Sequence, residues 1–240
     1  MKVFASMLLA SGLMTPLPVQ AQSAVDRVDV ALVLAVDVSG SVDDDRFALQ
    51  MEGIARAFED REVQNAILSG QNGALLVTLV NWSQKPQIAV PWRVIASPAD
   101  AMAFAADVRR APRRAEDFTC MSLMMQTVAE KVLPLMPLPA DRRVVDVSGD
   151  GRDNCNPRTP VDSVRDGLVA DRVTVNGLPI RAGREAESIA QWYDQHVIGG
   201  PASFLLPANG YEDFGRAIRQ KFIIEISGRP PRPAQEVARR

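Results

Sequence analysis

Runs of apolar, β-branched residues alternate with amphipathic segments along the chain. The run VDVALVLAV at 28–36 contains almost no polar residue, which is typical of a strand buried on both faces of a parallel sheet. A second such run, ALLVTLVNW, occupies 74–82. Residues 87–92 follow it after a short turn and predict a hairpin partner at the sheet edge. Further strands are expected at 143–147, 173–180 and 203–206.

The segments between these strands show the spacing of helices. In 41–60 the apolar positions recur every three or four residues, so that one helical face is buried, and Ser41 is placed to cap the first turn. This stripe consists of Phe47, Met51, Ile54 and Phe58. Ser97-Pro98 combines a cap with proline at the first helical position. Other helices are expected at 121–133, 159–170, 185–196 and 211–226.

The alternation of strands and helices predicts an α/β fold. We expect a doubly wound, mostly parallel sheet with one antiparallel edge strand and helices on both faces. The length of 240 residues suits one such domain. Hydrophobic residues make up 47% and charged residues 23%, values typical of a chain that buries a core, and they exclude disorder throughout.

The two ends of the chain differ from the domain between them. Residues 1–21 combine a basic residue, a short apolar stretch and a small-x-small pattern at 19–21, which is the layout of a secretory signal peptide. A buried N-terminal helix and a retained membrane anchor are the alternatives, although the apolar stretch is short for an anchor. We therefore expect a periplasmic or secreted protein whose domain occupies 22–227. Residues 228–240 lack periodicity and are expected to form a disordered tail.

Charge and the rare residue types exclude several classes of function. The net charge of −2 gives no indication of nucleic-acid binding. The single histidine, His196, argues against histidine-rich metal sites and weakens any Ser-His-Asp arrangement. Two cysteines are too few for a disulfide scaffold or a four-cysteine zinc site.

Polar residues follow two of the expected strands. Asp37, Ser39 and Ser41 come after the first strand, Asp150 comes after the strand at 143–147, and Thr119 precedes a helix. Ligands of open α/β sheets bind beyond the carboxyl ends of the strands, where these side chains would meet. Residues two apart in an extended segment share a face, so the first three can direct their oxygens to one point. Oxygen ligands suit a hard cation, Mg²⁺ first, with Mn²⁺ or Ca²⁺ as alternatives.

Two other interpretations of these residues remain open. The serines at 39 and 41 can serve as helix caps alone. The acidic run 43–45 can compensate the helix dipole or join the metal site, and we favour compensation. With only two carboxylates nearby, a bound cation would keep positive character and could recruit an acidic group from a partner protein.

The motif Asp37-Val38-Ser39-Gly40-Ser41, with Thr119 and Asp150, resembles the metal-ion-dependent adhesion site (MIDAS) of von Willebrand factor type A domains. The resemblance covers 28–227 and implies a doubly wound sheet in which the hydroxyls bind the cation directly or nearly so and the aspartates directly or through water. A late segment, 193–204, resembles an uncharacterised exported bacterial subfamily. The third motif departs from the usual pattern, because Gly149 separates the serine from the aspartate.

Two functions follow from these residues. The first is an exported, metal-dependent protein-binding module without catalysis. The alternative is a Mg²⁺-dependent, phosphatase-like hydrolase with Asp37 as nucleophile. Such an enzyme usually needs a cationic phosphate binder, and Arg152 is the only basic residue in the motif loops. A serine hydrolase is a weaker alternative, since only His196 could act as the base.

The two cysteines each follow a motif loop. Cys120 comes directly after Thr119, and Cys155 comes five residues after Asp150. If the loops meet, the two Cα atoms would fall within the range of about 4.4 to 6.8 Å that a disulfide needs, and an oxidising compartment would favour the bond. The bond would stabilise the fold by about 3 to 4 kcal/mol in the chain-entropy model. Two free, buried thiols are the alternative.

Overall fold

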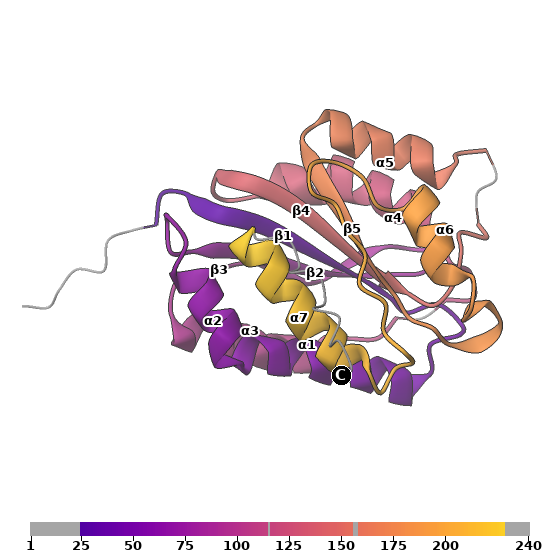
Figure 1. Cartoon of the computed structure of the whole chain (residues 1–240), viewed down its shortest axis with the longest axis horizontal. Helices are drawn as coiled ribbons and strands as arrows, with labels where there is room; N and C mark the ends of the chain where they lie inside the picture. The colour runs from indigo at the N-terminus through magenta and orange to yellow at the C-terminus, as the bar shows by residue number, and fades with distance from the viewer. Residues whose placement is uncertain (1–24, 115, 156–157, 229–240) are drawn as a thin grey trace, which may run out of the picture.

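The computed structural model describes residues 25–114, 116–155 and 158–228. Their strands form one sheet in the order β3-β2-β1-β4-β5, in which β3 is antiparallel to β2 and the other neighbours are parallel (Figure 1). The strands are β1 Val28–Asp37, β2 Leu75–Trp82, β3 Gln87–Ile95, β4 Ala140–Gly149 and β5 Val173–Pro179. The mostly parallel sheet with one antiparallel edge strand is therefore confirmed. The expected signal peptide at 1–21, and the expected tail beyond residue 228, lie outside the described residues.

Helices cover both faces of the sheet (Figure 1). One layer comprises α1 Asp44–Glu59, α2 Arg61–Leu68, α3 Pro98–Arg109 and α7 Phe214–Ser227. The other comprises α4 Met121–Thr127, α5 Val161–Ala170 and α6 Ile189–His196. The helix α4 continues into a π-helical turn, η1 Val128–Val132, and a 3₁₀ turn, η2 Leu133–Leu135. A further 3₁₀ turn, η3 Gly183–Glu185, follows β5.

Each face of the sheet buries its own apolar cluster. On the α1 side, the ring of Phe58 lies 4.7 Å from that of Phe104 and 5.2 Å from that of Phe222, centroid to centroid, beneath β1. On the α4 side, Met121, Met124, Met125, Trp82 and Tyr193 pack together. The continuous apolar run of β1 is explained by this arrangement, because β1 lies at the centre of the sheet and both of its faces are buried.

Three expectations about individual elements were wrong. Helix α1 is capped by Asp43, whose carboxylate accepts the N–H of Arg46 at 2.8 Å, and not by Ser41, whose hydroxyl points to Asp150 instead. Residues 203–206 do not form a strand: their backbone pairs with β5 in an isolated bridge between Gly177 and Leu205, and the N–H of Phe204 donates to the side chain of Asn176. The expected helix at 185–196 begins at Ile189, after the turn η3.

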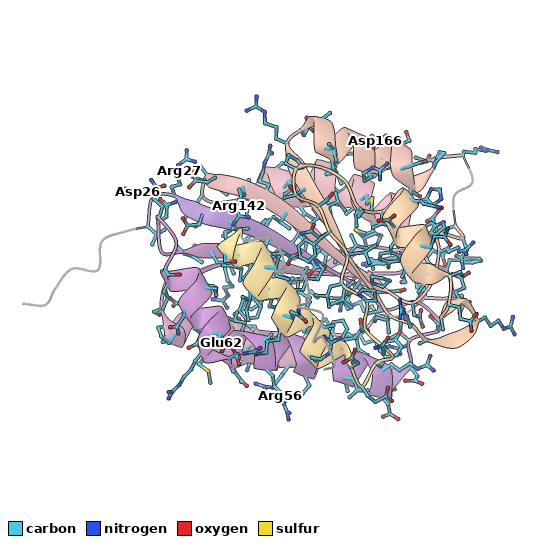
Figure 2. All side chains as sticks on the ribbon, in the orientation of Figure 1. Asp26, Arg27, Arg56, Glu62, Arg142 and Asp166 are labelled. Atoms are coloured by element: carbon cyan, nitrogen blue, oxygen red, sulfur yellow. A yellow bond between two sulfur atoms is a disulfide. The ribbon has the colours of Figure 1, made fainter. Side chains whose placement is uncertain are left out.

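The outer faces of the helices carry the charged side chains. In Figure 2, Arg56 on α1 and Asp166 on α5 lie on opposite outer sides of the molecule, away from the sheet. Among the described residues, no helix combines the length and the apolar character that a membrane span requires.

Candidate metal centre

The carboxyl ends of β1 and β4 lie side by side at the centre of the sheet. Val36 pairs with Ser148, so that the next residues, Asp37 and Gly149, end their strands together. A Cβ atom on Gly149 would lie 2.9 Å from Oδ2 of Asp37, closer than real contacts allow. The glycine that interrupts the usual motif therefore permits β4 to approach Asp37.

The structure brings both aspartates and both serines together. Oδ1 of Asp37 accepts the backbone N–H of Ser39 at 2.8 Å. The hydroxyl oxygens of Ser39 and Ser41 lie 3.4 Å apart. The hydroxyl of Ser41 donates to Oδ1 of Asp150 at 2.6 Å. These contacts link the loop after β1 to the loop after β4 through side-chain oxygens.

Thr119 joins the same neighbourhood from the loop before α4. A Cβ on Gly151 would lie 3.6 Å from Oγ1 of Thr119, which places the hydroxyl beside the loop after β4. The N–H of Thr119 donates to Oδ1 of Asn154 at 2.9 Å, and the N–H of Asn154 donates back to the carbonyl of Thr119 at 3.1 Å. Ser39, Ser41, Thr119 and Asp150 all line one cleft of about 640 Å³.

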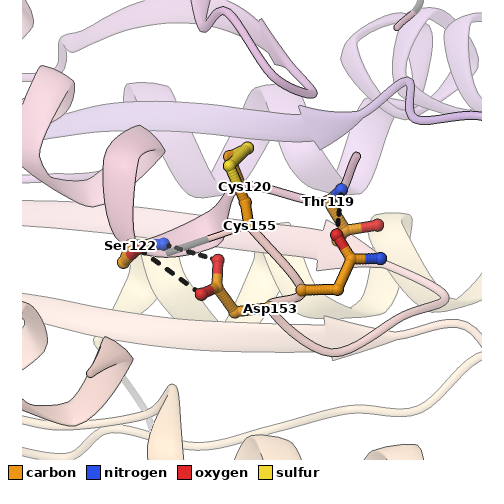
Figure 3. The surroundings of a disulfide bond; sticks show 6 residues. Thr119, Cys120, Ser122, Asp153 and Cys155 are labelled. Carbon is orange, nitrogen blue, oxygen red and sulfur yellow. Dashed lines mark hydrogen bonds between the residues drawn. A yellow bond between two sulfur atoms is a disulfide. The ribbon is translucent and has the colours of Figure 1, made fainter. Parts of the chain in front are cut away.

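A disulfide holds these two loops together (Figure 3). Cys120 and Cys155 are bonded, with their Cα atoms 4.9 Å apart, so the predicted disulfide is confirmed. Beside it, the N–H of Ser122 donates to Oδ1 of Asp153 at 3.3 Å. The alternative of two free thiols is excluded. Asn154 holds Thr119, whereas Asp153 holds Ser122 at the start of α4.

The electrostatics of the site are set by two close carboxylates. Asp37 is fully buried, and among the described residues its Oδ2 has no hydrogen-bond partner. Burial, together with the charge of Asp150, raises the pKa of Asp37 to about 7 despite the opposing effect of hydrogen bonds from Ser39 and Asp150. No basic side chain in the described part of the chain hydrogen bonds to either carboxylate.

The donor set fits a hard divalent cation. It consists of two carboxylates and three hydroxyls, without nitrogen or sulfur, and one buried carboxylate oxygen is left unpaired. Among the described residues, no group of three or more His, Cys, Asp or Glu side chains is arranged to hold a metal. A cation at this site would therefore depend on the hydroxyls as well as on the carboxylates.

Three residues near the site carry no local sequence signal. A Cβ on Gly149 would also lie 2.9 Å from the hydroxyl of Tyr193, whose pKa is raised by burial and by the charges of Asp37 and Asp150. Burial and the same two carboxylates raise the pKa of Tyr211. The guanidinium of Arg46 lies 5.2 Å from the Tyr211 ring centroid and donates to the carbonyl of Ser41.

His196 lies outside the cleft. It ends α6, with its Nδ1 3.7 Å from Oδ2 of Asp162, and it does not line the cleft that holds Ser39 and Ser41. The structure therefore does not provide the serine–histidine pair that a serine hydrolase would need.

Comparisons with known proteins agree with this architecture. A family described as "Protein of unknown function (DUF1194)" matches residues 27–230. Comparison with curated proteins gives no match.

Solved structures share the fold at low sequence identity. Proximal thread matrix protein 1 from the mussel byssus is 12% identical with a TM-score of 0.60, covering 83% of this chain and 46% of that one. A von Willebrand factor type A protein from Catenulispora acidiphila is 14% identical with a TM-score of 0.58, covering 83% and 43%. The corresponding domain of the type V pili tip protein Mfa5 from Porphyromonas gingivalis is 11% identical with a TM-score of 0.55, covering 83% and 96%.

The chain spans about half the length of the mussel protein. Another structure of that mussel protein has a zinc-occupied MIDAS motif. The family match extends over most of this chain, and the structural matches all show one fold. The chain therefore belongs to the DUF1194 family, and its fold is that of a von Willebrand factor type A-like domain.

Proposed function

We propose that this domain is an exported protein-binding module whose divalent-cation site recruits an acidic group of a partner. The ligands of the cation are Asp37, Ser39, Ser41, Thr119 and Asp150. The observation that carries the proposal is the buried carboxylate of Asp37 beside Asp150: its Oδ2 has no hydrogen-bond partner among the described residues. Two close carboxylates of like charge are unfavourable in a buried site, and a cation removes that cost.

The bound ion would offer a coordination position to a carboxylate of the partner. Mg²⁺ is the first candidate, with Mn²⁺ and Ca²⁺ next, because oxygen ligands that include hydroxyls discriminate poorly among hard cations. The zinc-occupied MIDAS of the mussel protein supports a divalent ion at the equivalent place in this fold.

Burial favours binding over hydrolysis. A nucleophilic aspartate must reach its substrate, whereas Asp37 is fully buried and its Oδ1 is occupied by the N–H of Ser39. Arg152, the candidate phosphate binder, is engaged by Ser188 at 2.9 Å and by Glu185. Ser41, by contrast, borders the cleft and is open to a partner.

Three observations support export and partner binding. The disulfide between Cys120 and Cys155 is the kind of bond that persists in oxidising compartments. Phe118, 48% exposed, lies next to Thr119 and supplies an aromatic contact of the type that contributes strongly at binding interfaces. Two proteins with the same fold are a pilus adhesin and a pili tip protein.

The test is a titration of wild type and the Asp37→Ala variant with Mg²⁺, Mn²⁺ and Ca²⁺. Wild type should bind at least one of these ions and gain stability, by about 2.7 kcal/mol at a metal concentration of 100 times Kd. Asp37→Ala should stay folded in chelator, because it removes a carboxylate from a repulsive pair, but it should lose this gain. Melting temperature and bound metal are the measurements.

Asp45→Ala is the matched control, since Asp45 is an exposed aspartate of α1 that does not line the cleft. It should respond to metal as wild type does. The proposal fails if wild type binds none of the three ions, or if Asp37→Ala binds them as well as wild type.

A further inference from the structure

The cleft around the candidate ligands carries two exposed, unpaired charges. Asp117 lies beside the first motif, since a Cβ on Gly40 would lie 3.4 Å from its carbonyl oxygen. Arg184 belongs to the turn η3 and borders the cleft from the side of β5. Both side chains are exposed, and neither forms a hydrogen bond or ion pair with any described residue.

The turn that carries Arg184 is attached to the loop after β4. Oε2 of Glu185 accepts the N–H of Arg152 at 3.0 Å, and the guanidinium of Arg152 donates to the hydroxyl of Ser188 at 2.9 Å. Arg152 and Glu185 therefore already have hydrogen-bond partners within the protein. Arg184 is therefore the cleft-lining cation that is left for an external anion.

We propose that the cleft selects a segment of a partner protein that carries two acidic side chains, one bound at the cation site and the second paired with Arg184. This inference rests on the proposed function. Asp117, on the side of the first motif, repels an acidic group there and so directs the second acid toward Arg184.

The size of the cleft supports a segment larger than a single carboxylate, and Arg184 supplies a separate position for a second one. The cleft volume of about 640 Å³ lies within the range of ligand-binding clefts. The planar guanidinium of arginine offers parallel N–H donors that match a carboxylate, which gives Arg184 geometric specificity that a lysine would lack. Complementary charges at the rim of an interface mainly determine specificity, which is the role assigned here.

The test measures binding of capped peptides in a Gly/Ser background to the purified protein in Mg²⁺. One peptide contains a single aspartate, and the others contain two aspartates separated by none, one or two residues. Wild type should bind the best two-aspartate peptide about fivefold more tightly than the single-aspartate peptide, as expected for one exposed ion pair. Arg184→Ala should remove this preference, Arg184→Lys should keep part of it, and Asp117→Asn should increase binding of both peptides.

Arg181→Ala is the matched control, because Arg181 is an exposed arginine of the same segment that does not line the cleft and contacts Asn209. It should keep the preference. The inference is overturned if wild type binds no peptide, if it binds both kinds equally, or if the preference survives in Arg184→Ala. A metal titration without peptide separates a failure of the proposed function from a failure of this inference. Absence of metal binding refutes the proposed function. Metal binding without the peptide preference refutes this inference alone.

Discussion

Two groups of buried carboxylates lie along the central strands, and they balance their charge in different ways. The first is the candidate cation site, with Asp37 at the end of β1 and Asp150 after β4. The second, which we call the ionic cluster, consists of Asp146 on β4 with Lys221 and Glu225 on α7. Both groups are almost completely removed from solvent.

The ionic cluster contains its own cation. Nζ of Lys221 lies 3.0 Å from Oδ1 of Asp146, contacts Glu225, and lies 4.7 Å from the ring centroid of Phe204. Asn176 donates to Oε1 of Glu225 at 2.7 Å. Burial, together with the charge of Glu225, raises the pKa of Asp146 to about 8 despite Lys221. A proton held by Asp146 therefore lowers the negative charge that lies beside Lys221.

The candidate cation site lacks such an internal partner. Burial raises the pKa of Asp37 although hydrogen-bond donors oppose it, and no lysine or arginine of the described residues bonds to Asp37 or to Asp150. The comparison shows that a lysine balances the charge of one buried acidic group, whereas the other, at the carboxyl edge of the sheet, has no cation of its own among the described residues. An external cation at the candidate cation site would supply the positive charge that Lys221 provides in the ionic cluster.

Removal of Lys221 should have the largest effect on stability, and it tests whether this lysine balances the ionic cluster. Lys221→Met leaves the carboxylates of the ionic cluster without their cation, so the free energy of unfolding should fall by about 3 to 5 kcal/mol. Urea denaturation in chelator measures this loss. Lys131→Met, at an exposed lysine of η1, should change it by less than about 0.5 kcal/mol. A similar small loss for both variants would show that Lys221 does not balance the cluster.

The pH dependence of stability should report on Asp146. Its pKa is raised from 3.8 to about 8 in the folded state, so the stabilisation from its proton is present below about pH 4 and is lost as the pH rises through 8. Asp146→Asn replaces the protonated carboxyl group with a neutral amide of the same shape. Relative to wild type, the variant should gain stability from pH 5 to about pH 8 and then level off, measured by urea denaturation in chelator. A constant difference across this range would contradict a protonated Asp146.

The smallest effect should separate helix capping from metal binding at the start of α1. Asp43→Ala removes the cap and should cost about 1 kcal/mol without weakening metal binding. Ser41→Ala should do the reverse, with little loss of stability in chelator and a clear loss of affinity for Mg²⁺. Thermal melting in chelator and metal titration give both values. If Ser41→Ala destabilises the metal-free protein as much as Asp43→Ala does, the hydroxyl has a structural role that the cap assignment omits.

Much of the fold follows from local patterns. The apolar runs predicted all five strands of the sheet, and the stripe of Phe47, Met51, Ile54 and Phe58 predicted α1. Helix α2 was not predicted, although Asp60 caps it by accepting the N–H groups of Glu62 and Val63. Periodicity encodes which positions are buried, and burial is the main determinant of these elements.

The candidate site was accessible from the sequence because its residues follow strand ends. Asp37 ends β1, Ser39 and Ser41 follow it, and Asp150 comes directly after β4; the parallel register of these strands brings their ends together. The disulfide followed from the same reasoning applied to Cys120 and Cys155. Position relative to the ends of the strands thus indicated the candidate ligands and the covalent link beside them.

Only the tertiary structure decided the pairings between distant segments. Lys221 reaches Asp146 because α7 packs beneath the sheet, and Tyr193 approaches Asp37 because Gly149 leaves room for both. Arg184 borders the cleft through the turn after β5. None of these contacts has a local signature, since each depends on how a helix or loop docks many residues away. The sequence by itself determined where strands end and which oxygens follow them, whereas the docking of α7, α6 and η3 decided which charges those oxygens meet.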